Sequence, residues 1–266
     1  VGQDKPRNET FYLVDFENHE KTKIDLSNLP GISDDPLANL RKNAAKKIGY
    51  KYKALKGNRA LYAYNWHVNQ GVEWSANSQV AAIMLFSYDN KDRWIITFDT
   101  KKKDAQTAHW LSDEAWVNDW TFNEFGWLEN TEQLYYLSEE SGYSHLYLKA
   151  LTKKPTQLTS GKFEVSDVTL LEDESGFVFK ANKVHPGIYE IYQVDLAKKL
   201  TALTSLGGFN NYTLSSDQTS LLIEHSTVTM PPELYIQSLT TEQSQPIKVT
   251  DTVTEEFKRL PWTAPS

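Results

Sequence analysis

The chain has no cysteine among its 266 residues, which excludes disulfide bonds, thiolate catalysis and cysteine-based zinc sites. This absence is compatible with a bacterial cytoplasm or periplasm and does not choose between them. The sequence also lacks any run of about 18 apolar residues, the length that a membrane-spanning helix needs. Its opening residues, VGQDKPRNET, lack the basic start and apolar centre of a signal peptide. They are typical of the interior of a protein, so we expect a fragment of a longer chain.

Basic residues are scarce relative to acidic ones, with 28 Lys and Arg against 35 Asp and Glu. The net charge of -7 argues against a nucleic-acid-binding surface, which needs clustered positive charge. The lysine runs at 101–103 and 198–199 are therefore interpreted as solvated hairpin ends. Glycine is also scarce, at 12 residues, whereas 8 Trp and 14 Tyr are present. This composition favours packed β structure, and the length allows one large all-β domain or two smaller ones.

The most informative stretch is residues 122–161, FNEFGWLENTEQLYYLSEESGYSHLYLKALTKKPTQLTSG. Short apolar and aromatic segments alternate there with turns rich in Asn, Glu, Ser, Gly and Pro, a pattern that predicts antiparallel strands. The expected strands are Phe122–Trp127, Gln133–Leu137, His145–Leu151 and Thr156–Leu158.

The features of this stretch recur along the chain. An aromatic or aliphatic residue stands seven positions before an apolar residue of the next strand, as in Trp74–Ala81, Trp127–Leu134, Leu170–Phe177 and Leu214–Leu221. An aliphatic–aromatic pair stands five positions before a leucine, as in Leu146-Tyr147, Ile191-Tyr192 and Leu234-Tyr235. An apolar–Thr pair then closes each repeat, as in Leu158-Thr159, Leu203-Thr204 and Val249-Thr250.

This repeat of about 43–45 residues with four strands is typical of β-propeller blades. We expect an all-β fold: a propeller fragment of about four full four-stranded antiparallel blades plus a half-blade, with one short helical insertion. The predicted divisions are a half-blade at 10–27, a helical insertion at 33–49, blades at 60–112, 116–160, 164–207 and 209–251, and an exit segment at 252–266.

Individual elements outside the repeats can also be predicted. Phe11–Phe16 and Thr22–Leu26 read as two strands of the half-blade, and Ala60–His67 as a further strand. Val80–Ser87 is almost continuously apolar, which predicts a strand covered on both faces. The sequence SDDPLANLRKNAAKKI predicts a helix with an apolar stripe (Leu37, Leu40, Ala44) and an N-cap among Ser33, Asp34 and Asp35.

Catalytic and metal-binding motifs are not found in the sequence. No Gly-x-Ser-x-Gly is present, so the nucleophile elbow of a serine hydrolase is missing. The six histidines occur singly, without the spacing of a metal site. Asp89, Asn90 and Asp92 offer oxygen ligands for calcium but no bidentate Glu downstream, so an ordinary hairpin is preferred. We expect no catalytic residue, metal or cofactor in this chain.

Glu139 and Glu140 precede a glycine in SEESGY and are interpreted as a solvated turn. Paired carboxylates at this place could instead bind a substrate amine.

Several segments together resemble the N-terminal β-propeller of the dipeptidyl peptidase IV branch of prolyl oligopeptidase-type serine peptidases. They are FNEFGWLENTEQLYYLSEESGYSHLYL, preceded by DEAWV and followed by QLTSGKFEV, with VEWSANSQ, DNKDRWI, DPLANLRK and PPELYIQSL. The resemblance covers residues 10–262. It implies an eight-bladed propeller followed by an α/β-hydrolase domain with a Ser-Asp-His triad, which removes N-terminal dipeptides. In that family the propeller limits access to the site and contributes a Glu pair that binds the substrate's free amine.

The chain departs from this pattern at both ends. It stops at KRLPWTAPS, where the resemblance places the start of the hydrolase domain, and it begins after the blade that would carry the Glu pair. The role of that pair is therefore not transferred to Glu139 and Glu140. Within the hairpin KVHPGI, His185 and Ile188 are the candidate substrate-lining residues, against an ordinary hairpin as the alternative.

The resemblance implies as partners the protein's own C-terminal hydrolase domain and a peptide substrate, with no nucleic acid and no membrane. Because an open arc of blades leaves unpaired sheet faces, we also expect a homo-oligomer. A periplasmic or secreted location is preferred to the cytoplasm. The alternative function is that of a stand-alone propeller that binds a protein or a glycan, because a fold does not determine function.

Overall fold

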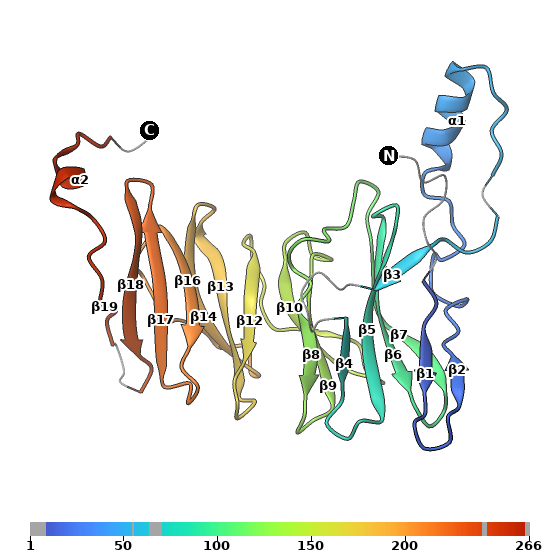
Figure 1. Ribbon diagram of the computed structural model, residues 1–266, viewed down its shortest axis with the longest axis horizontal. Coiled ribbons are helices and arrows are strands. Elements are labelled where there is room, and N and C mark those ends of the chain that lie inside the picture. The colour runs from blue at the N-terminus through green and yellow to red at the C-terminus, as the bar shows by residue number, and fades with distance from the viewer. Residues whose placement is uncertain (1–8, 55, 64–70, 241–243, 264–266) are drawn as a thin grey trace. The chain divides into compact units, whose positions relative to one another are not determined.

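The structure, a computed structural model, describes residues 9–54, 56–63, 71–240 and 244–263 (Figure 1). The chain divides into two compact units. Unit 1 consists of Val1–Tyr136 and Lys149–Lys154, and unit 2 of Leu137–Leu148 and Pro155–Ser266. Short antiparallel strands dominate both units, which confirms the predicted all-β, propeller-type fold.

The first half of the chain holds a two-stranded and a five-stranded sheet. In the five-stranded sheet the order is β3-β5-β6-β7, and β4 also pairs with β5. The elements are β1 (Tyr12–Val14), β2 (Lys21–Lys23), α1 (Ala38–Lys47), β3 (Leu61–Ala63), β4 (Val72–Trp74), β5 (Val80–Ser87), β6 (Asp92–Asp99) and β7 (Asp104–Ser112).

The second half of the chain continues with a four-stranded sheet in the order β11-β10-β9-β8 and an eight-stranded sheet. In the eight-stranded sheet, two four-stranded groups are joined by one parallel bridge, Tyr189 to Phe209. The elements are β8 (Phe125–Leu128), β9 (Gln133–Ser138), β10 (His145–Ala150), β11 (Thr156–Gln157), β12 (Val165–Leu170), β13 (Gly176–His185), β14 (Ile188–Asp195), β15 (Leu200–Ala202), β16 (Phe209–Leu214), β17 (Ser220–Thr227), β18 (Met230–Ser238), β19 (Ile247–Lys248) and α2 (Glu255–Arg259).

The first recurring sequence feature is explained by strand register. The residues seven positions apart are cross-strand partners in the first hairpin of each group: Trp74 with Ala81, Trp127 with Leu134, Leu170 with Phe177 and Leu214 with Leu221. Each of these hairpins turns through a residue with a positive φ between 50° and 54°, namely Ser78, Glu132, Glu174 and Gln218. The repeat in the sequence is therefore a repeat of one hairpin geometry.

The third strand of a group is joined to the residues just after the fourth strand by a threonine clasp, which accounts for the threonine of the recurring apolar–Thr pair. In one group the Thr204 Oγ1 accepts from the Ile191 N–H at 2.9 Å and donates to Glu190 Oε2 at 2.5 Å. Thr250 makes the same two contacts with Leu234 and Glu233. Thr159 accepts from the Leu146 N–H at 3.0 Å, and its hydroxyl lies 3.1 Å from the ring of His145.

Replacing Thr204 by valine is expected to lower the local opening free energy at Ile191 by about 1–3 kcal/mol, since it leaves a buried N–H and a buried carboxylate without this partner. Native-state hydrogen exchange of the Ile191 amide measures this loss. Thr201→Val, an exposed change on β15, is the matched control. Equal exchange rates in both variants would contradict a stabilising clasp.

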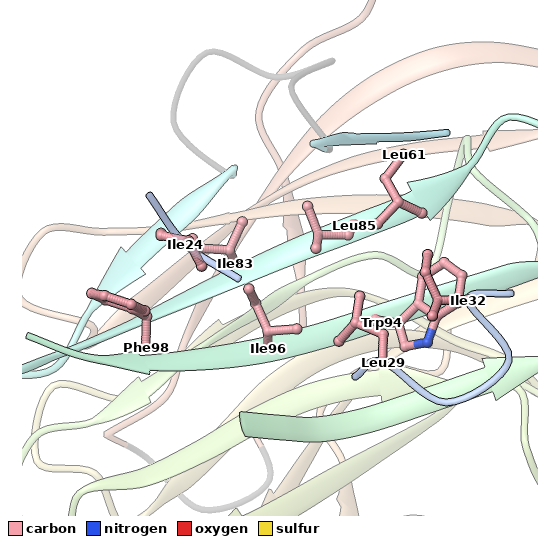
Figure 2. Packing of buried hydrophobic residues seen from close by; sticks show 9 residues of the cluster. All are labelled: Ile24, Leu29, Ile32, Leu61, Ile83, Leu85, Trp94, Ile96 and Phe98. Atoms are coloured by element: carbon pink, nitrogen blue, oxygen red, sulfur yellow. The ribbon is translucent and has the colours of Figure 1, made fainter. Parts of the chain in front are cut away.

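One hydrophobic core cluster of unit 1 lies on one face of β5 and β6. The partners Ile83 with Ile96 and Leu85 with Trp94 point to the same side, where they meet residues from the segment after β2. Figure 2 shows this layer, which consists of Ile24, Leu29, Ile32, Leu61, Ile83, Leu85, Trp94, Ile96 and Phe98. The opposite face of β5 is buried as well, as its apolar sequence predicted.

The helix begins later than the sequence predicts, so the predicted N-cap is wrong. The N-cap of α1 is Leu37, without a side-chain cap. Asp35 is not available, because its carboxylate binds Arg41 and accepts from the Tyr52 hydroxyl at 2.7 Å. The expected apolar stripe is not buried either, since α1 has no buried residue, and Figure 1 shows the helix projecting away from the strands of its unit.

Several strand predictions need corrected bounds. Of Ala60–His67, Leu61–Ala63 forms a strand and Ala60 does not, while residues 64–67 lie outside the described residues. The strand predicted at Thr22–Leu26 is Lys21–Lys23. The strand predicted from Phe122 begins at Phe125, because Phe122 has a φ of +63° and belongs to the preceding loop.

Candidate functional site

The predicted substrate-lining residues lie at the turn of the β13–β14 hairpin. His185 and Ile188 are cross-strand partners on either side of Pro186 and Gly187. The His185 Nδ1 accepts a hydrogen bond from the Gly187 N–H at 3.1 Å, so the ring folds onto its own turn. His185 is exposed and Ile188 is half-buried. A contact of either residue with a substrate stays a prediction.

Glu139 and Glu140 form the β9–β10 turn, as the sequence predicted. The Gly142 N–H donates to the Glu139 carbonyl at 2.8 Å, and the Glu140 N–H donates to the Ser138 Oγ at 3.2 Å. Gly142 has a φ of +96°, a conformation that favours glycine at this position.

The carboxylates considered for calcium are engaged by an arginine. Arg59 lies 2.7 Å from the Asp92 carboxylate and 3.1 Å from that of Asp89, and all three side chains are largely buried. Arg59 also donates to the Gly31 carbonyl at 2.9 Å. These carboxylates therefore anchor the β5–β6 hairpin, in agreement with the preferred structural reading. Within the described part of the chain, no group of three or more His, Asp or Glu residues could hold a metal ion.

The histidines lie in separate places. His145 is buried, with its Nε2 3.0 Å from the Gly161 carbonyl oxygen, and His225 Nδ1 lies 2.8 Å from Asn210 Oδ1. His109 is buried against the ring of Tyr136 at 4.5 Å. His67 lies outside the described residues. His109, His145 and His225 therefore serve packing and local hydrogen bonding.

Sequence reasoning missed two exposed tryptophans of unit 1, which lie on the loop 113–122 between β7 and β8. We call this segment the aromatic loop. Trp116 is 75% exposed and Trp120 is 69% exposed, whereas Val117 between them is buried. Tryptophan is enriched among the residues that contribute most binding energy at interfaces, so these two side chains are candidates for a contact surface. The signal in the sequence is the pair of tryptophans within the polar segment DEAWVNDW.

The β5–β6 hairpin holds the first half of the aromatic loop. The Val117 N–H donates to the Asn90 carbonyl at 2.7 Å, and the Asp113 N–H donates to the Lys91 carbonyl at 3.0 Å. The Lys91 ammonium donates to the Glu114 carbonyl at 2.6 Å and to that of Ala115. The hairpin therefore supports the backbone around Trp116 on both sides.

Side chains of the loop and of β3 hold its second half. Asn118 Oδ1 accepts from the N–H groups of Trp120 and Thr121 at 2.9 and 3.3 Å. The Tyr62 hydroxyl donates to Asp119 Oδ2 at 3.4 Å. Burial, together with the neighbouring Asp119 carboxylate, raises the pKa of Tyr62, so the phenol stays a donor at all physiological pH values.

The aromatic loop combines two indole surfaces with negative charge. Asp113, Glu114 and Asp119 lie in the same ten residues. Indole faces bind apolar side chains and cations, and carboxylates attract ammonium groups. The loop is therefore chemically suited to contact apolar and cationic groups.

Another polar group of side chains in unit 1 consists of Glu73 on β4, Glu124 just before β8 and Tyr135 on β9. Burial raises the pKa of Tyr135 to about 12, with the charges of Glu73 and Glu124 adding to the effect. Burial also raises the pKa of Glu73. The ring of Tyr135 lies over Gly126, where an added Cβ would come within 2.7 Å of its hydroxyl. Glycine at position 126 is thus required for this packing.

Three ionisable groups of unit 2 couple its stability to pH. Burial lowers the pKa of His145 and of His225 below the usual 6.5. Hydrogen bonds from the Thr250 hydroxyl and the Thr252 N–H lower the pKa of Glu233 from 4.5 to about 2.

We expect acidification to destabilise unit 2 in two stages. In the unfolded chain His145 and His225 take up protons near pH 6.5, whereas in the folded chain their pKa values are lower. Their contribution to the stability of unit 2 is therefore present above pH 6.5 and is lost as the pH falls from 6.5 toward the folded pKa values. The contribution of Glu233 is present above pH 4.5 and is lost as the pH falls toward about 2. Melting temperatures measured from pH 8 to pH 3 test this expectation. His145→Gln should weaken the first stage and Thr250→Val the second, and an unchanged profile in both would contradict it.

Comparisons with known proteins agree with this fold. The chain resembles the crystal structure of Porphyromonas gingivalis dipeptidyl peptidase 4, with a TM-score of 0.66 and 14% sequence identity over 92% of this chain and 30% of that one. It also resembles a Bacteroides ovatus structure assigned as a dipeptidyl aminopeptidase IV, with a TM-score of 0.57 and 15% identity over 89% of this chain and 36% of that one. The chain thus spans about a third of the length of each.

At this level of identity the structural similarity shows the fold alone. No curated protein sequence matches the chain. The family profile described as dipeptidyl peptidase IV (DPP IV) N-terminal region matches residues 63–232, which is more than half of the chain. The matched range contains the repeated hairpins, the aromatic loop and the β13–β14 hairpin. The chain therefore belongs to the dipeptidyl peptidase IV N-terminal region family.

Proposed function

We propose that this chain is the non-catalytic, substrate-gating propeller portion of a serine exopeptidase that removes dipeptides from the N-termini of peptides. The observation that carries the proposal is the family match over residues 63–232. The aromatic loop, with its two exposed indoles, supplies a surface for the peptide. His185 and Ile188, at the turn of β13–β14, are the second proposed contact.

In this proposal the partner of the chain is a C-terminal α/β-hydrolase domain of the same protein. That domain would supply the serine nucleophile, for which this sequence has no Gly-x-Ser-x-Gly motif. The role of the present chain is to select and orient the peptide, which raises the rate by holding the scissile bond near the nucleophile.

The experiment compares the intact protein with the isolated chain on Xaa-Pro chromogenic dipeptides. We expect turnover by the intact protein and none by residues 1–266 alone. Turnover by the isolated chain that scales with its concentration and survives repurification would overturn the non-catalytic role. The downstream reading frame is a second test, since a Gly-x-Ser-x-Gly with later Asp and His supports the peptidase and a stop codon contradicts it.

The alternative function is that of a stand-alone propeller that binds a protein or a glycan, and one cavity in unit 2 supports the glycan. This cavity of about 520 Å³ lies between β15 and the end of β18. Its lining is rich in hydroxyl and amide groups and has no ionisable side chain: Thr201, Ala202, Leu203, Thr204, Ser205, Gln237, Ser238, Leu239, Ser244, Gln245 and Pro246. Binding of oligosaccharides by the intact protein, without turnover of Xaa-Pro substrates, would favour this alternative.

We propose further that the isolated chain self-associates through the outer face of β17 and β18. The partners Leu222 and Ile236 are 41% and 46% exposed, and Leu234 is 36% exposed. An apolar sheet face of this kind is stabilised by covering it. Leu222→Lys is expected to shift the isolated chain from dimer to monomer in light scattering. Val228→Lys, at the exposed β17–β18 turn, should not, and a monomeric wild-type chain would contradict the proposal.

A further inference from the structure

The aromatic loop ends in a strained backbone junction. Phe122, its last residue, has a φ of +63°. A bulky side chain in the left-handed region costs free energy and persists only where the surrounding structure holds it. Phe122 lies two residues after Trp120, so its conformation sets the direction in which the chain leaves the tryptophan. A side chain that fixes the backbone at Phe122 therefore also restricts the backbone at Trp120.

That side chain is Arg93. Its Nη1 donates to the Phe122 carbonyl at 2.9 Å and to Asn123 Oδ1 at 2.7 Å. Arg93 has no exposed surface, and Asn123 is 2% exposed. Within β6 the backbone of Arg93 pairs with Phe86 on one side and with Leu111 on the other. The guanidinium is therefore fixed by a central strand of the sheet and transmits that rigidity to the junction.

Both ends of the aromatic loop are tied to the same short segment. Asn90 and Lys91 hold its first half, and Arg93, two residues later, holds its end. These contacts bridge 22 to 30 positions in the sequence, so the loop is fixed by the β5–β6 hairpin rather than by its own residues alone.

We propose that Arg93 is a positioning residue, which fixes the aromatic loop so that Trp120 and Trp116 present a rigid surface to the substrate. The consequence for peptide binding rests on the proposed function. Arg93 itself has no exposed surface, so its proposed role is to hold the loop and not to bind the peptide. Its effect is to reduce the number of loop conformations that binding would otherwise have to restrict, which improves affinity without changing the chemical step.

The first measurement is hydrogen exchange of the loop amides in the intact protein. Arg93→Met is expected to raise the exchange of the Trp120 and Thr121 amides at least tenfold, whereas those of Trp94 and Ile95 in β6 stay protected. Arg93→Lys should retain part of the protection. Arg93 makes further contacts, so Asn123→Ala, which removes only its contact with Asn123, tests the junction by itself. This variant is expected to raise the exchange of the loop amides less than Arg93→Met does. Lys102→Met, an exposed change at the β6–β7 turn, is the control.

The second measurement separates positioning from the proposed function. On an Xaa-Pro p-nitroanilide substrate, Arg93→Met is expected to raise KM about tenfold with kcat within twofold. Unchanged loop exchange in Arg93→Met and Asn123→Ala would overturn the positioning role. Raised exchange with an unchanged KM would support positioning and overturn the substrate contact instead. If Arg93→Met fails to fold, the loop exchange rates and the KM values of Asn123→Ala and Arg93→Lys test the positioning role in its place.

Discussion

Replacing Arg59 by methionine is expected to lower the free energy of unfolding of unit 1 by about 3–5 kcal/mol, the range for breaking a buried ion pair at one partner. The side chain of Arg59 is 6% exposed, and those of its partners Asp92 and Asp89 are 4% and 14% exposed. Methionine would leave two carboxylates in the interior without this cation. It would also remove the donor to the Gly31 carbonyl and the cation over the Trp94 ring, 5.5 Å from its centroid.

Two further variants give this prediction its control. In Arg59→Met combined with Asp92→Asn, one uncompensated charge is removed, so part of the loss should be recovered. Lys103→Met breaks the ion pair with Glu20, whose two side chains are 47% and 61% exposed, and exposed pairs contribute at most about 1 kcal/mol. Urea unfolding measured by tryptophan fluorescence reports all three. A loss in Arg59→Met no larger than in Lys103→Met would contradict the structural role of the buried pair.

The effect of Arg59→Met should extend to the aromatic loop. Asp89 and Asp92 flank Asn90 and Lys91, whose backbone carbonyls accept from the loop. Arg59 thus supports the hairpin, and the hairpin supports the loop. Urea concentrations below the unfolding transition should raise loop exchange more in this variant than in the wild type.

The repeated architecture could be predicted from the sequence because its signals are local. Trp74 and Ala81 are seven residues apart and face each other across one tight hairpin. The same interval recurs wherever that hairpin recurs, so spacing alone revealed the unit. The threonine of each clasp likewise recurs in the sequence, as the second residue of the apolar–Thr pairs, but its partner earlier in the chain, such as Glu190 14 residues before Thr204, is seen only in the structure.

The candidate site could not be predicted in this way, because its contacts are not periodic. Arg93 meets Phe122 from 29 positions away, and Arg59 meets Asp89 from 30. No propensity indicates that a phenylalanine adopts a positive φ, so Phe122 was read as the start of a strand. The cap of α1 was misplaced for a similar reason, since Asp35 is drawn to Tyr52 by tertiary contacts.

The double replacement Trp116→Ala, Trp120→Ala is expected to lower kcat/KM of the intact protein for Xaa-Pro p-nitroanilides by about 10- to 100-fold, or about 1.4–2.8 kcal/mol. The reason is that the two indoles, 75% and 69% exposed, offer a large rigid surface at a low entropic cost. The loss should fall on KM, because in the proposed function the loop contacts the peptide in the ground state and the transition state alike.

Matched variants separate this surface from general effects of losing tryptophan. Trp262→Ala removes an indole that is 53% exposed and lies outside the loop, and it should leave KM unchanged. Trp120→Phe keeps an aromatic face and should retain most of the activity. If the double variant keeps its KM while its loop amides stay protected, the aromatic loop is rigid but does not contact the substrate. The peptide surface would then have to lie elsewhere on the chain, with the β13–β14 turn at His185 and Ile188 as the remaining candidate.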